Sequence, residues 1–125
     1  MFYLISPPEP TGWHLDHNEF ARDLAAAWSG FRLLPPEPKS ETRSLVWEVP
    51  DSNGGSNWLE GSLDRPGEAI YLRGDLHLAA KFADWLRKKV DPAQPLVFTD
   101  ESLEHIIDMQ PNEPVVETIV QGFLS

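Results

Sequence analysis

AIYLRGDLHLAAKFADWLRKKVDPAQPLVFT, residues 69–99, is the stretch that decides the fold. It predicts a strand over Ala69–Arg73, a helix over Leu76–Val90 and a second strand over Leu96–Thr99. Apolar side chains recur at helical spacing through its middle: Leu78, Ala79, Phe82, Ala83, Trp85, Leu86 and Val90. We therefore expect one face of this helix to lie in the core and the other in solvent.

The ends of this helix carry their own signals. Asp75 can accept hydrogen bonds from the free amides of the first turn, and Pro92 prevents the helix from continuing. Arg87, Lys88 and Lys89 fall in the last turn, where the helix dipole favours cations.

The rest of the chain adds strands and helices around this unit. Further strands are predicted over Phe2–Ser6, Phe31–Leu34, Leu45–Val49 and Trp58–Leu63. A helix begins at the capping residue Asp16 and ends before Gly30, and a terminal helix follows Pro114. Residues 103–109 fit either a strand or a short helix, and we favour the strand because Pro111 closes it. Residues 45–49, 58–63 and 69–73 would form an antiparallel meander.

Together these signals predict one α+β domain over residues 1–125. Its sheet is mainly antiparallel, with about three central strands plus edge strands, and about three helices pack on it. A chain of 125 residues can bury a sizeable core without disulfides, and it contains no cysteine. No apolar run approaches the roughly 20 residues of a membrane span, and no basic segment precedes the first apolar residues. We expect a cytoplasmic protein that needs no cofactor.

Negative charge dominates the composition. The chain has 20 acidic and 10 basic residues, a formal net charge of -10. Residues 91–125 contain seven carboxylates and neither Lys nor Arg. Such a field repels nucleic-acid phosphates and attracts basic surfaces, although it also serves solubility.

The pattern resembles a group of small uncharacterised bacterial α+β proteins. Residues 74–87, GDLHLAAKFADWLR, carry the likeness together with residues 96–101, LVFTDE, and the later PNEP helix start. Residues 19–28 and the strand 44–48, SLVWE, fit the same pattern. The resemblance implies no activity and no residue role. In size and charge the chain is also similar to the acidic immunity proteins that neutralise basic toxins.

The candidate partner-binding residues are acidic, with one aromatic anchor. Asp100, Glu101, Glu104 and Asp108 lie within nine residues of each other, and His105 falls among them. Trp13 lies in a segment rich in Gly and Pro, where an exposed indole can anchor a contact. Paired carboxylates can also carry out acid–base catalysis or hold a hard cation, but this spacing is not that of a calcium-binding loop.

The densest group of metal-ligand types is His14, Asp16 and His17. Two imidazoles and a carboxylate at a helix start could meet one divalent ion. The alternative is that Asp16 caps the helix while both histidines face solvent.

These observations favour a non-enzymatic interaction protein of the immunity or regulatory type, which binds a basic partner and neither nucleic acid nor membrane. One alternative is a small metal-dependent or carboxylate-based enzyme. Another is a homo-oligomeric structural protein that pairs through a sheet edge near Phe2–Ser6 or Leu96–Thr99.

Overall fold

In a computed structural model, the described residues form seven strands and three helices. The structure describes residues 2–8, 13–28, 30–34, 43–50, 58–64, 67–100, 102, 104–111 and 114–124. Its elements, in chain order, are β1 (Phe2–Ser6), α1 (His17–Ala27), β2 (Arg32–Leu34), β3 (Arg43–Pro50), β4 (Trp58–Asp64), β5 (Ile70–Gly74), α2 (Leu76–Lys89), β6 (Val97–Asp100), β7 (Ile106–Asp108) and α3 (Val115–Leu124). The predicted α+β class is confirmed, and residues 106–108 form a strand as expected.

All pairs in the sheet are antiparallel, in the order β2-β3-β4-β5-β1-β6-β7. The predicted meander of β3, β4 and β5 is present, with Trp47 opposite Gly61 and Gly61 opposite Leu72. The first strand lies inside the sheet, because β1 pairs with β5 on one side and with β6 on the other. The expected edges at Phe2–Ser6 and Leu96–Thr99 were therefore wrong, since β2 and β7 end the sheet.

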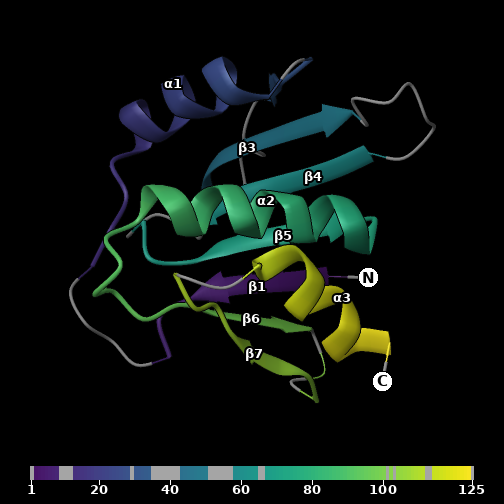
Figure 1. The fold of residues 1–125 in the computed structure, drawn as a ribbon. Coiled ribbons are helices and arrows are strands. Elements are labelled where there is room, and N and C mark those ends of the chain that lie inside the picture. Colours follow the sequence, from purple (N-terminus) through teal and green to yellow (C-terminus); the bar gives the residue numbers. More distant parts are fainter. Residues whose placement is uncertain are drawn as a thin grey trace.

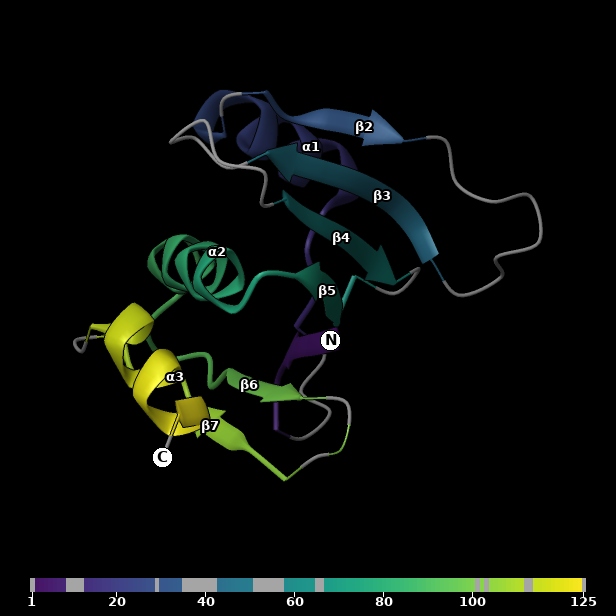
Figure 2. The ribbon, with the colours of Figure 1, turned by 90° about the vertical axis from the view of Figure 1, so that its right-hand side faces the viewer.

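The three helices of the described residues lie on the same face of the sheet, and none of them covers the other face (Figures 1 and 2). Strand β5 shows the resulting alternation, with Ile70 and Leu72 buried and Tyr71 and Arg73 exposed. Under the helices, the Trp47 ring stacks on Phe82 at 5.8 Å between centroids. The core is therefore a single layer of side chains between the sheet and the helices.

Both predicted N-caps are present. The Asp16 carboxylate accepts a hydrogen bond from the Glu19 amide at 2.9 Å, and that of Asp75 accepts one from the Leu78 amide at 3.1 Å. Each carboxylate bonds to a first-turn amide that has no partner within the helix. These bonds stabilise the starts of α1 and α2 at the positions that the sequence indicates.

Arg87 lies in the last turn of α2 as expected, but it does more than interact with the helix dipole. Its side chain is buried, with the residue only 2% exposed. Its guanidinium donates hydrogen bonds to the backbone carbonyls of Asp91 (2.7 Å), Gln94 (2.8 Å) and Met109 (3.4 Å). Burial lowers the pKa of Arg87 below its usual range, and Asp91 acts in the opposite direction. The residue joins the end of α2 to the segments before β6 and after β7.

Candidate functional site

Asp100, at the end of β6, organises the β6–β7 hairpin. One carboxylate oxygen accepts hydrogen bonds from the Ser102 hydroxyl at 3.0 Å and the Glu104 amide at 3.1 Å. The other lies 2.9 Å from Nδ1 of His105. The hydrogen bond from His105 is the main cause of a lowered pKa for Asp100, and the bond from Ser102 adds to it, while burial acts against both. This carboxylate is thus occupied within the chain.

The Asp100–His105 pair has limited means for chemistry. The carboxylate orients the imidazole through Nδ1. One side of the imidazole is covered by Phe123, whose ring is 4.9 Å away. The Ser102 hydroxyl bonds to Asp100, so Ser102 and His105 are not arranged as a nucleophile and its base.

The predicted partner-binding residues of this region separate in the structure. Asp100 is buried, whereas Glu104 and Asp108 are exposed. Glu101 lies outside the described residues. The acidic surface that the hairpin offers to a partner is therefore smaller than the sequence suggested.

The candidate metal ligands at the start of α1 have other contacts. Asp16 caps the helix, and the His17 ring donates from Nε2 to the Asp64 backbone carbonyl at 3.1 Å. His14 is exposed. Within the described ranges, no three His, Asp or Glu side chains are grouped so that they could hold a metal ion.

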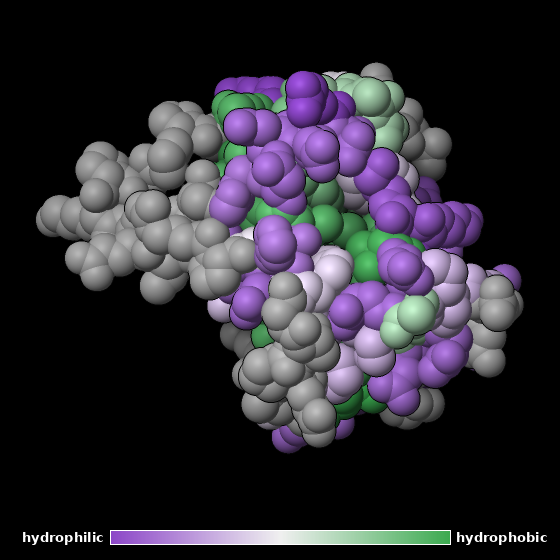
Figure 3. All heavy atoms as spheres, turned by 90° about the vertical axis from the view of Figure 1, so that its left-hand side faces the viewer, coloured by the Kyte–Doolittle hydropathy of each residue, from purple (hydrophilic) through white to green (hydrophobic). Residues whose placement is uncertain are grey.

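Trp13 lines a groove of about 240 Å³ between the start of α1 and the end of α2. Among the described residues that line it are four carboxylates, from Asp16, Glu19, Asp23 and Asp91, and one cation, Lys89. Its apolar walls come from Trp13, Leu15, Phe20, Leu86 and Val90. Figure 3 views this end of the molecule and shows apolar surface framed by hydrophilic side chains.

Lys89 is the internal counterion of the groove. Its Nζ lies 3.3 Å from an Asp23 carboxylate oxygen and 5.4 Å from the centre of the Trp85 ring. One ammonium cannot balance four carboxylates, so the groove keeps a negative potential.

The groove and the β6–β7 turn lie at opposite ends of β6, whereas Asp108 pairs with Val97 where β6 begins. Asp91, in the groove, precedes this strand, whereas Ser102 and Glu104 follow it. Figure 1 shows the start of α1 on one side of the molecule and the β6–β7 turn on the other. Trp13 therefore does not share a surface with the acidic turn.

Sequence reasoning missed most of the groove. Asp16, Glu19 and Asp23 have the spacing i, i+3, i+7, which places them on one helical face, and this signal was present in the sequence. No local pattern indicated that Lys89 and Asp91 would face them, because the contact joins two helices that β2, β3, β4 and β5 separate along the chain.

No helix in the described part of the chain is long and apolar enough to span a lipid bilayer. Comparisons with protein-family models, with curated proteins and with solved structures find no match for this chain.

Proposed function

We propose that this chain is a cytoplasmic, non-enzymatic interaction protein of the immunity or regulatory type, and that it binds a basic protein. The groove around Trp13 carries the proposal, because an excess of carboxylates surrounds apolar walls there. The partner contributes a Lys or Arg side chain to this groove.

The shape and chemistry of the groove suit a long cationic side chain. The methylene stem of Lys or Arg packs on apolar surface while its charged head stays near water and carboxylates. Trp13 and Phe20 offer rings to such a stem, and Glu19 and Asp91 offer charge to the head. A cation held near an indole also gains from the negative face of the ring.

The net charge of -10 supports the same partner class. A negative field speeds the encounter with a basic protein and repels the phosphates of nucleic acid. Glu104 and Asp108 are exposed on the β6–β7 hairpin and add to the negative field that attracts such a partner.

Affinity capture from lysate of the native host tests the proposal. The tagged chain should retain a basic protein at low salt, and moderate salt should release much of it, because exposed charges are screened. The variants Trp13→Ala and Glu19→Gln should each retain markedly less of that protein, whereas Glu117→Gln on α3 removes the same charge elsewhere and should retain it.

Two results would count against the groove. Retention of no basic protein, under conditions where the chain is folded, would remove the proposed partner class. Equal retention by Trp13→Ala and wild type, with loss in Glu104→Gln or Asp108→Asn, would assign binding to the hairpin instead.

A further inference from the structure

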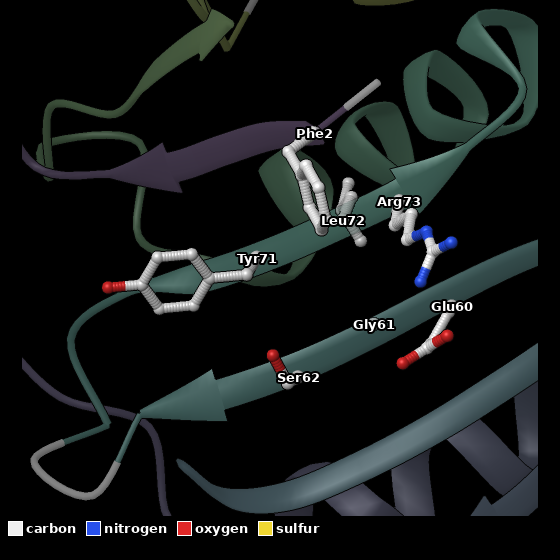
Figure 4. Close-up of a pocket in the computed structure, with 7 residues that line it drawn as sticks. All are labelled: Phe2, Glu60, Gly61, Ser62, Tyr71, Leu72 and Arg73. Atoms are coloured by element: carbon white, nitrogen blue, oxygen red, sulfur yellow. The ribbon is translucent and has the colours of Figure 1, made fainter. Parts of the chain in front are cut away.

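The face of the sheet that no helix covers carries large exposed side chains. Phe2 of β1, Trp58 of β4 and Tyr71 of β5 are 42%, 43% and 36% exposed. Figure 4 looks onto this face, with Phe2 and Tyr71 standing on it and α2 behind the sheet. Aromatic residues with this exposure at the middle of a sheet are typical of interface centres.

Arg73 joins these aromatic residues. Its guanidinium lies 5.6 Å from the centre of the Phe2 ring and 6.0 Å from that of Trp58. Glu60 is its direct neighbour across β4 and β5. In the described part of the chain, neither charged group has an ion-pair partner, so both can meet groups on another molecule.

The hollow between these side chains is shallow. Phe2, Ser62, Tyr71 and Arg73 are among its lining residues, and it encloses about 10 Å³, room for one water molecule. A small-molecule ligand needs a far larger cavity. The face therefore suits another extended surface.

One row of charged side chains crosses the middle strands of this face. The register places Arg32, Glu48, Glu60 and Arg73 in one row across β2, β3, β4 and β5, and Phe2 follows on β1. Their four charges cancel in a chain whose net charge is -10. Along this row, two copies can approach without the repulsion that their acidic surfaces would cause elsewhere.

We propose that this open face binds the same face of a second copy, with a twofold axis between β4 and β5. That axis places Arg73 opposite Glu60 of the second copy, and the reverse pair forms at the same time. It also sets the large Tyr71 opposite the small Ser62, since these two are register neighbours. A uniformly charged partner would meet at least one group of its own sign.

The dimensions are those of a sheet-on-sheet interface. Seven strands about 4.8 Å apart make a face roughly 30 Å wide, and stacked sheets pack about 10 Å apart. The interaction uses a surface separate from the Trp13 groove, so it is independent of the proposed partner binding.

Sedimentation equilibrium over a wide concentration range, combined with charge exchange, tests the dimer. Wild type should dimerise. The variants Arg73→Glu and Glu60→Arg should each weaken self-association at least tenfold, because each places like charges opposite one another. An equimolar mixture of the two variants should associate again, since both ion pairs return with their signs reversed. Trp58→Ser should also weaken the dimer.

Arg22→Glu is the matched control, because it makes the same charge change on an exposed position of α1. It should leave dimerisation unchanged, and circular dichroism should show all variants folded. A wild type that stays monomeric at the highest concentration overturns the proposal. A mixture of Arg73→Glu and Glu60→Arg that fails to associate also overturns it. If wild type is monomeric and Trp58→Ser no longer retains some other protein in affinity capture, the face binds that protein and not a second copy.

Discussion

At the end of α2, one guanidinium serves three backbone carbonyls. Arg87 has no carboxylate within salt-bridge distance in the described residues, and its hydrogen bonds go to carbonyls that precede β6 or follow β7. A planar group with five donors fits this task, whereas an ammonium does not. Arg87 therefore connects α2 to the segments that flank β6 and β7. Its position beside Lys88 and Lys89 in the sequence does not indicate this role.

Replacement of Arg87 by Met should destabilise the fold by about 2 kcal/mol, because the buried Met109 carbonyl and the part-buried contacts to Asp91 and Gln94 lose their donor. Arg87→Lys should recover only part of this, since one ammonium cannot reach all three carbonyls with the same geometry. Urea unfolding monitored by tryptophan fluorescence measures both. Lys88→Met is the control, because this neighbouring side chain is 73% exposed, and it should change stability by less than about 0.5 kcal/mol.

Asp100 should give the fold a specific acid sensitivity. Its pKa in the folded state lies below the ordinary 3.8. Its ionised form therefore contributes stability above that value, and the contribution is lost as pH falls through the lower folded pKa. Wild type should be more stable than Asp100→Asn at pH 7, and the difference should shrink below roughly pH 3.8 in urea unfolding. A difference that is constant from pH 7 to pH 2.5 would contradict this.

At the scale of elements, the pairing of β3 with β4 places a large residue opposite a small one. Trp47 is fully buried and lies opposite Gly61 in the register. A Cβ atom on Gly61 would come within 2.4 Å of the Trp47 ring. The glycine leaves the space that the indole fills, and this packing sets how Trp47 meets Phe20 and Phe82 under the helices.

Gly61→Ala should destabilise the protein by about 1–3 kcal/mol, the usual cost of overpacking a core. Trp47→Phe should also destabilise it, because it leaves a cavity. The double variant should be more stable than the sum of the two losses predicts, since the smaller ring makes room for the methyl group. A double-mutant cycle by chemical unfolding measures this, and strict additivity would show that the two residues do not compete for space.

At the scale of the whole molecule, the excess negative charge opposes compactness. The chain has a net charge of -10, and in the described residues only a few ion pairs, such as the exposed Arg32–Glu48, add attraction against the resulting repulsion. Exposed pairs contribute little, about 0–1 kcal/mol each. Self-repulsion should therefore dominate the response to salt.

Raising sodium chloride from about 10 to 300 mM should raise the melting temperature, because the Debye length falls from roughly 30 Å to below 10 Å. Calorimetry at low protein concentration checks this without a contribution from dimers. Potassium chloride should give the same shift at equal ionic strength. A melting temperature that falls with salt would mean that the ion pairs outweigh the repulsion, and a response to only one cation would indicate specific binding.

Much of the local structure could be predicted. Asp16 and Asp75 cap their helices as expected, and the meander over β3, β4 and β5 followed from alternation and turns. These signals depend on neighbours within a few residues, where spacing alone decides which groups meet. The candidate site was predicted less well. Trp13 and Asp16 line the groove, but Asp100 is turned inward to His105.

The sequence by itself determined the element types, the helix ends, the Trp47-containing core strand and the acidic net charge, because each follows from local pattern or composition. Only the tertiary structure decided that β1 lies between β5 and β6, that Arg87 is buried and that four carboxylates line one groove with Trp13. Those arrangements join segments far apart in the chain. Which of these arrangements forms depends on how the sheet and the helices bury apolar surface together. Alternative packings of the whole chain compete in this respect, and no short stretch of sequence decides between them.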